Sequence, residues 1–280
     1  MQPKVSVYFD FNSPYALLSA IRIYQIYNKD IGAIKQQETE YPLSTTDTTH
    51  PVLSKVKFEL RPIDFGSLSA RTTKGVQVTR NPIRGKYTWS DPARTLPKLG
   101  IEKKLEEPNP SWWPQGVSLV NKVAYILMCR DTFHNAAKEV ISNYNQADFD
   151  PSWRDTITEA GGSLESAIAS EYVFRVYEQF MLEHNKLRDD GVLSGIVEKI
   201  LAKYPEASRR LGGTSTVLEL AKKSKSAKSV AQGFTEEAIG RGVFGVPTFS
   251  TEQGEIFWGN DHLVDAAIIA SENHVTKAKL

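Results

Sequence analysis

The sequence predicts an α/β fold in which a helical region interrupts a small mixed domain. Strand and helix patterns alternate over the first 64 residues and return after about residue 232, whereas the segment between them carries mainly helical patterns. Apolar strands next to amphipathic helices are typical of layered α/β folds. We therefore predict a discontinuous domain from residues 1–64 and 232–280, with an all-helical domain inserted at residues 65–231.

The N-terminal elements follow the order strand, helix, strand. VSVYFDF (5–11) is almost entirely apolar, as expected of a strand buried on both faces. Apolar residues then recur at helical spacing over residues 14–27, and VKFELRPI (56–63) predicts a second strand. This order implies parallel strands joined by a right-handed crossover. The polar, turn-rich residues 35–51 predict an exposed loop between them.

The middle of the chain reads as a helical unit. Trp112-Trp113-Pro114 at its entrance is interpreted as a group of core aromatics. A lysine-rich segment near its end is interpreted as a solvated helix face rather than a nucleic-acid site. The helical segments are predicted at residues 118–133, 166–184, 191–204 and 211–233.

The C-terminal part returns to mixed structure. A helix that ends in glycine is followed by a strand, a tight turn, a hairpin partner and a closing helix. Combined with the N-terminal elements, this order is that of a thioredoxin-like fold with a helical insertion. The segments are residues 235–242, 246–250, 252–254, 255–259 and 261–272.

Composition excludes several classes of protein. The chain of 280 residues has a formal net charge of +1, which does not suggest a nucleic-acid partner or an anionic membrane surface. Cys129 is the only cysteine, so an internal disulfide and a redox Cys pair are excluded. No signal peptide or membrane-spanning run is recognised, which predicts an intracellular protein. The terminal Ala278-Lys279-Leu280 is similar to a peroxisomal import signal and predicts that location, with the cytoplasm or mitochondrion as the alternative.

Neither a metal nor a nucleotide cofactor is expected. Gly240, Gly242 and Gly245 satisfy the G-x-G-x-x-G string, but a helix precedes them and a strand follows, the reverse of a dinucleotide site. Ser13 lacks the G-x-S-x-G elbow of hydrolases. The histidines show no i, i+4 pair and no cysteine at metal-ligand spacing; they are His50, His134, His184, His262 and His274.

Ser13 has two readings. A serine followed by Pro14 is a favoured helix start, so Ser13 could be an N-cap and nothing more. In a thioredoxin-like fold, however, the first helix begins opposite a loop that contains a cis-proline. Asn12-Ser13-Pro14-Tyr15 and Gly245-Val246-Pro247-Thr248-Phe249 would then form opposite walls of one site.

Four motifs carry a family resemblance. In sequence order they are similar to those of kappa-class glutathione transferases and 2-hydroxychromene-2-carboxylate isomerases, thioredoxin-like proteins related to bacterial disulfide oxidoreductases. They cover both ends of the chain, and the helical insertion resembles theirs more loosely. The motifs are Phe9-Asp10-Phe11-Asn12-Ser13-Pro14-Tyr15, Arg61-Pro62, Gly242-Val243-Phe244-Gly245-Val246-Pro247-Thr248-Phe249 and Phe257-Trp258-Gly259-Asn260-Asp261.

The resemblance implies a glutathione site. Ser13 would hydrogen-bond the glutathione sulfur and stabilise its thiolate, with Pro14 and Tyr15 beside it. The backbone of Val246, before Pro247, would pair with the cysteinyl part. Asn260 and Asp261 would hold the γ-glutamyl end. A family contact that usually follows the Arg-Pro strand is altered in this chain, and Thr73, Lys74 or Asn81 could replace it.

The resulting hypothesis is a kappa-like glutathione transferase that acts on a small apolar electrophile. One alternative is a glutathione-dependent isomerase of the 2-hydroxychromene-2-carboxylate type. The other is a redox-dead thioredoxin-fold binding protein, which the absent cysteine pair would suit. The resemblance also implies a homodimer.

Overall fold

The structure is a computed structural model. The residues that it describes are 2–28, 48–74, 82–109, 111, 113–145, 151–158, 162–187 and 189–278. The predicted loop at 35–51 falls mostly outside them, as do Trp112, Asn81, Lys279 and Leu280.

A four-stranded mixed sheet in the order β2-β1-β3-β4 forms the centre of the fold. β1 runs parallel to β2, with Lys4 opposite Lys57, and antiparallel to β3, with Val5 opposite Thr251. β3 and β4 form an antiparallel hairpin. The parallel pair and the hairpin agree with the sequence prediction. The strands are β1 (Lys4–Phe9), β2 (Lys57–Pro62), β3 (Thr248–Thr251) and β4 (Ile256–Trp258).

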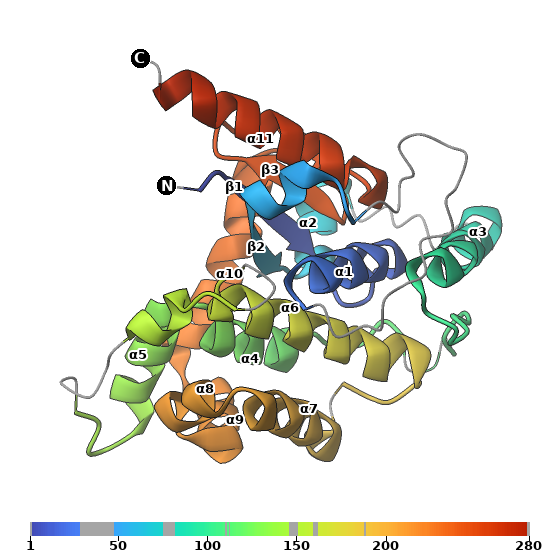
Figure 1. Cartoon of the computed structure of the whole chain (residues 1–280). Coiled ribbons are helices and arrows are strands. Elements are labelled where there is room, and N and C mark those ends of the chain that lie inside the picture. Colours follow the sequence, from blue (N-terminus) through green and yellow to red (C-terminus); the bar gives the residue numbers. More distant parts are fainter. Residues whose placement is uncertain are drawn as a thin grey trace.

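Helices cover the sheet and extend away from it. Figure 1 shows α11 at one end of the molecule and α7, α8 and α9 at the opposite end. The helices of the thioredoxin-like part are α1 (Pro14–Tyr27) and α11 (Leu263–Ala278). Those that follow β2 are α2 (Phe65–Thr72), α3 (Pro82–Thr95), α4 (Ser118–Met128), α5 (Arg130–Val140), α6 (Leu164–Tyr177), α7 (Asp190–Lys203), α8 (Pro205–Leu211), α9 (Gly213–Lys223) and α10 (Lys225–Gly240).

Short helical turns complete the chain. A π-helical turn continues α6, and a 3-10 turn precedes α11. None of the helices in the described part of the chain combines the length and hydropathy needed to cross a membrane. These turns are η1 (Pro51–Lys55), η3 (Leu96–Leu99), η5 (Pro151–Asp155), η6 (Glu178–Leu182) and η7 (Asn260–His262).

Alternation along β1 explains how both faces of the sheet are buried. Val5 and Val7 point to one face, where they pack in a cluster with residues of α11. Tyr8 points to the other face, where it packs with Ala238 of α10 and Leu68 of α2. The sequence VSVYFDF is apolar at nearly every position because helices cover both faces.

The helical insertion and the first helix share one large core. This core joins Phe9 of β1 and Leu17 of α1 to buried residues of α4 and α6, such as Val123 and Tyr172. Helix α10 continues through residue 232, where the second thioredoxin-like segment is predicted to begin. The division into residues 1–64 with 232–280 and residues 65–231 stays a prediction.

Two of the predicted helical segments are broken in the structure. The segment 118–133 is interrupted at Cys129, which is extended, because buried Arg154 donates to the carbonyl oxygens of Ile126 and Leu127 at the end of α4. The segment 211–233 is interrupted at Ser224, whose hydroxyl caps α10 by accepting from the Ala227 N–H at 3.1 Å. Polar groups that end one helix and start the next therefore override a continuous helical pattern.

Candidate functional site

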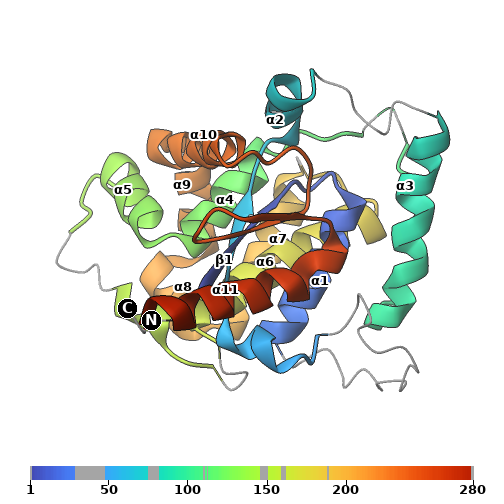
Figure 2. The ribbon, with the colours of Figure 1, turned by 90° about the horizontal axis from the view of Figure 1, so that it is seen from above.

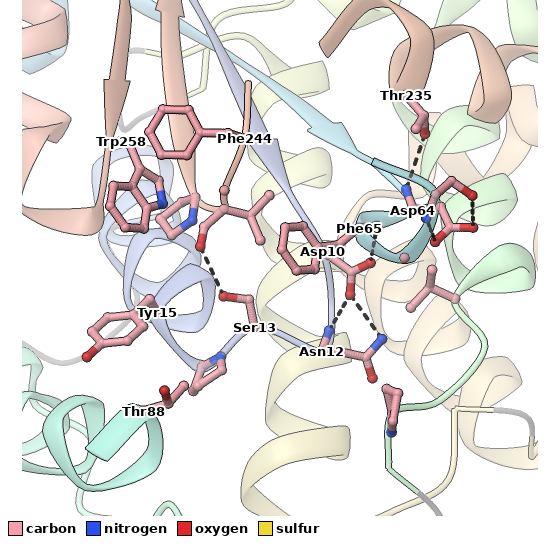
Figure 3. Close-up of a pocket in the computed structure, with 18 of the residues that line it drawn as sticks. Asp10, Asn12, Ser13, Tyr15, Asp64, Phe65, Thr88, Thr235, Phe244 and Trp258 are labelled. Atoms are coloured by element: carbon pink, nitrogen blue, oxygen red, sulfur yellow. Dashed lines mark hydrogen bonds between the residues drawn. The ribbon is translucent and has the colours of Figure 1, made fainter. Parts of the chain in front are cut away.

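The N-terminus of α1 lies opposite the loop that enters β3. The Ser13 hydroxyl accepts from the Ala16 N–H at 3.3 Å, which is N-cap geometry, and donates to the Val246 carbonyl oxygen at 3.3 Å. The Val246-Pro247 peptide bond is cis. Figure 3 shows the Ser13 hydroxyl pointing toward this loop. Ser13 is thus both a helix cap and a group in contact with the opposite wall, so the two readings of its sequence do not exclude each other.

A large cavity opens at this contact. Its volume is about 2010 Å³, which exceeds the range of roughly 300 to 1,000 Å³ usual for small-ligand sites. The cavity therefore has room for two small ligands at once. All the residues that the resemblance assigns to glutathione line it: Ser13, Pro14, Tyr15, Val246, Pro247, Asn260 and Asp261.

Asn260 and Asp261 lie at the start of the last helix but differ in exposure. The Asn260 amide oxygen accepts from the Ser19 hydroxyl at 3.1 Å, and its carbonyl oxygen accepts from the guanidinium of Arg22, which is fully buried on α1. The Asp261 carboxylate is more than half exposed. Helix α1 therefore carries Ser13 at its first turn and holds Asn260 with its second and third turns.

Tyr15 connects α1 to α3. Its hydroxyl donates to the Asp91 carboxylate at 3.1 Å, and the Tyr87 hydroxyl donates to the other oxygen of that carboxylate at 3.1 Å. Burial and the Asp91 charge raise the pKa of Tyr15 well above its ordinary value. Tyr15 is therefore a neutral hydrogen-bond donor that holds α3 against the site.

The three replacements proposed for the altered family contact differ in their position. Thr73 lines the cavity, where its hydroxyl donates to the Ser69 carbonyl oxygen at 3.1 Å. Lys74 does not belong to the lining and has a φ of 53°. Asn81 lies outside the described residues. Thr73 is thus the member of this group that the structure brings to the cavity.

An exposed apolar rim borders the cavity. It consists of Ile83, Tyr87, Phe244 and Trp258, each between 44% and 83% exposed. Phe244 and Trp258 make a T-shaped contact with ring centroids 5.1 Å apart. Figure 3 shows this pair beside Ser13, across from α3. Elsewhere in the described residues, large exposed apolar side chains occur singly, so the rim is the place where they gather.

Gly245 allows Trp258 to approach the proline loop. A Cβ atom at this glycine would lie 2.4 Å from the indole nitrogen of Trp258, which is closer than packing permits. The close approach of Trp258 thus explains why residue 245 is a glycine, without a role in a dinucleotide-binding loop.

The sequence patterns did not predict two features of the site, the burial of Asp10 and the place of Trp113 in the cavity lining. Asp10 is buried behind Asn12 and Ser13, and its carboxylate is bound by three N–H donors. Trp113 was interpreted as a core aromatic, and it packs edge-on against buried Trp89 of α3, but it also lines the cavity. An acidic residue within the apolar VSVYFDF stretch was the available signal for Asp10.

Metal-ligand clusters are not found at this site or elsewhere in the part of the chain that the structure describes. Cys129 is away from the cavity lining, and burial raises the pKa of its thiol to about 11. The cavity thus offers a hydroxyl, a helix N-terminus, amides and carboxylates for ligand binding.

A sheet with one parallel and two antiparallel pairings, a cis-proline loop opposite the first helix and a helical insertion define a thioredoxin-like protein. The predicted fold class is confirmed.

Figure 2, which looks along another direction, shows α3 at the outer edge of the molecule, separated from α4, α5, α9 and α10.

Comparison with solved structures gives the same fold. A 2-hydroxychromene-2-carboxylate isomerase matches 99% of this chain over 98% of its own, with a TM-score of 0.55 and 19% identity. A probable DsbA oxidoreductase from Streptomyces coelicolor matches 96% of this chain over 89% of its own, with a TM-score of 0.51 and 10% identity. No protein-family model and no curated protein matches the sequence. These similarities establish the thioredoxin-like fold with a helical insertion.

Proposed function

We propose that the protein is a glutathione transferase of kappa-like type, which joins glutathione to a small apolar electrophile. The observation that carries this proposal is the Ser13 hydroxyl, which lies at the N-terminus of α1 and opposite the cis-proline loop, in the wall of a cavity. A helix N-terminus favours negative charge, and such positions lower the pKa of a thiol from about 8.5. A thiol bound here would therefore be held as a thiolate.

The neighbouring residues suit the other parts of the tripeptide. Exposed Asp261 offers a carboxylate to the γ-glutamyl ammonium group. The amide oxygen of Asn260 is already bonded to Ser19, so its contact with the ligand would come from its nitrogen or its backbone. The backbone of Val246 would pair with the cysteinyl part, as the family resemblance implies.

The reaction uses the sulfur as a nucleophile. The Ser13 hydroxyl would turn from the Val246 carbonyl, where its 3.3 Å bond is long, and donate to the thiolate. The sulfur electron pair then forms a bond to an electrophilic carbon, and the leaving group departs with its own electron pair. The exposed apolar rim is the proposed binding surface for the electrophile.

A second candidate is a glutathione-dependent isomerase. The similarity in fold to a 2-hydroxychromene-2-carboxylate isomerase favours it. In that reaction the thiolate adds to a conjugated system, allows rotation or ring closure, and leaves again with its electron pair restored. Mass analysis of products separates the two candidates, since the transferase product retains glutathione and the isomerase product does not.

Disulfide oxidoreductase activity is not proposed, although one structural neighbour carries that name. Cys129 is the only cysteine, and it lies away from the cavity. Peroxisomal location through Ala278-Lys279-Leu280 and assembly as a homodimer are further proposals, which import assays and sedimentation would test.

The proposal is tested by calorimetric titration of glutathione into the protein. We expect binding in the range of physiological glutathione, and we expect Asp261→Ala to weaken it by about tenfold, because an ammonium group loses its charged partner. Asp265→Ala is the matched control, since Asp265 is equally exposed, also contacts His262 and lies outside the cavity lining. Absence of binding at millimolar glutathione would reject a glutathione-dependent function.

A further inference from the structure

Asp10 lies at the end of β1 and is 3% exposed. One carboxylate oxygen accepts from the backbone N–H of Asn12 at 2.7 Å and from its side-chain amide at 3.0 Å. The other accepts from the backbone N–H of Phe65, the first residue of α2, at 2.9 Å. Figure 3 shows these bonds converging on the carboxylate beside the turn that carries Ser13.

The contacts continue from Asn12 to the opposite loop. Its side-chain oxygen accepts from the Gln115 N–H at 2.8 Å, and its amide nitrogen donates to the Gln115 carbonyl oxygen at 3.1 Å. The carbonyl oxygen of Asp10 meanwhile accepts from the Ser13 N–H at 2.9 Å and from the Tyr177 hydroxyl at 2.7 Å. Asp10 thus bonds directly to the Ser13 turn and to the start of α2, and through Asn12 it is connected to the loop at residue 115. All three segments belong to the cavity wall.

We propose that Asp10 is a positioning residue whose ionised carboxylate assembles these three segments into a binding-competent site. All the groups bonded to its carboxylate are donors, so the negative charge strengthens every one of these bonds. Protonation removes that charge and adds an O–H that has no acceptor among these partners. Protonation of Asp10 therefore weakens its hold on the Ser13 turn and on the start of α2.

The protonation of the Asp10 carboxylate is expected within a pH range that can be measured on the folded protein. Burial raises the pKa of Asp10 to about 6, with a smaller contribution from the neighbouring Asp64 charge, while the three hydrogen bonds oppose the rise. Asp64 at the start of α2 and Tyr177 of α6 are the titratable groups that face Asp10 from the elements packed against it. Asp10 is thus ionised at pH 7.5 and protonated at pH 5.

The first test is independent of glutathione. Amide chemical shifts of Asn12 and Phe65, recorded by NMR between pH 4.5 and 8 in the wild-type protein, should follow one titration with a midpoint near 6. The same amides in Asp10→Asn should show no such titration. Flat wild-type amides across this range would overturn the proposal, and this measurement needs no variant to fold.

The second test rests on the proposed function. Glutathione affinity of the wild type should fall about tenfold between pH 7.5 and pH 5, as one charge-assisted contact is lost, with the same midpoint. The carboxyl groups of glutathione titrate below this window, but a bound thiol with a lowered pKa can titrate within it. The affinity is therefore measured with S-methylglutathione, which has no thiol proton. Asp10→Asn should show a weaker affinity that does not change with pH.

His262 supplies the matched control, because it is an ionisable side chain that lines the cavity and contacts Asp261. His262→Gln should keep the pH dependence of the wild type. Loss of that dependence in His262→Gln, with its retention in Asp10→Asn, would assign it to the histidine and overturn the proposal. If glutathione binds at no pH, the proposed function fails, and the amide titration alone decides the role of Asp10.

Discussion

The two sides of the cavity are built differently. On the side of the first helix, Asp10 and Asn260 are buried, and each is bonded to groups from other segments of the chain. On the exposed apolar rim, Ile83 is 83% exposed and Trp258 is 53% exposed. A wall fixed by several directional bonds suits a ligand of constant shape, whereas an exposed apolar surface suits ligands that vary. The contrast agrees with a fixed thiol ligand and a variable electrophile.

The largest effect is expected when the Ser13 hydroxyl is removed from the side of the first helix. We expect Ser13→Ala to lower turnover by about 10²-fold, as loss of one preorganised donor does in other enzymes. Glutathione affinity should change far less, because the backbone and Asp261 contacts remain. Steady-state kinetics with an aromatic halide and glutathione would measure both.

The loss of an N-cap accounts for part of any effect at Ser13. Capping serines contribute about 1 kcal/mol to stability. Ser163→Ala is the matched control, since Ser163 caps α6 by accepting from the Ser166 N–H and lies outside the cavity lining. Equal losses of turnover in the two variants would remove Ser13 from the mechanism.

The charge of Asp10, on the side of the first helix, gives an effect of similar size. The pKa of Asp10 is about 6 in the folded protein and 3.8 in its ordinary state, so the folded state binds the proton more tightly. Stability therefore falls as the pH rises from about 4 to about 6. Compared with Asp10→Asn, the wild type should lose about 3 kcal/mol of unfolding free energy over this range.

Urea unfolding at several pH values measures this difference. Asp189→Asn is the control, because Asp189 caps α7 at an exposed position. A wild-type curve parallel to that of Asp10→Asn would show that burial does not shift the Asp10 carboxyl.

The packing of rim residue Trp258 against the proline loop is tested at Gly245. The added Cβ of Gly245→Ala would lie 2.4 Å from the Trp258 indole nitrogen, so the indole must move. We expect a loss of about 1 to 3 kcal/mol in unfolding free energy, as for other overpacked sites, and a higher KM for the electrophile. Gly195→Ala in α7 has no neighbour within 4 Å and should instead be neutral or stabilising. Unchanged electrophile kinetics in Gly245→Ala would show that the position of Trp258 does not affect electrophile binding.

The smallest effect is expected at the rim itself. Ile83→Ala should change the unfolding free energy by less than about 0.5 kcal/mol, because the side chain is exposed. It should raise the KM for a bulky apolar electrophile a few-fold and leave glutathione affinity intact. Ile126→Ala, at a fully buried position of α4, should cost about 2 to 5 kcal/mol. Equal electrophile kinetics in wild type and Ile83→Ala would exclude Ile83 from electrophile binding.

Local patterns predicted much of the fold. Helix α1 begins and ends where its Ser-Pro start and apolar spacing place it, and the β3-β4 hairpin follows its turn residues. The breaks at Cys129 and Ser224 were not predicted, because the first depends on Arg154, which is distant in sequence. Interactions between distant residues are invisible to a local pattern.

The same limit applies to the site. Ser13 and Pro247 carry recognisable motifs, and the structure places them together. The roles of Asp10 and Arg22 depend on partners at Phe65 and Asn260, far along the chain. A charged residue inside an apolar strand or helix indicates a buried partner, but the sequence does not name it.

Helix α1 fixes the separation between Ser13 and Asn260. Its first residue follows Ser13, and its Ser19 and Arg22 hold Asn260, so the rise of one helix sets the separation between the two contact points. Six to nine residues at 1.5 Å each give roughly 9 to 14 Å. A rigid helix cannot shorten or lengthen to follow a ligand. If glutathione binds as proposed above, a ligand that contacts both points must match this length.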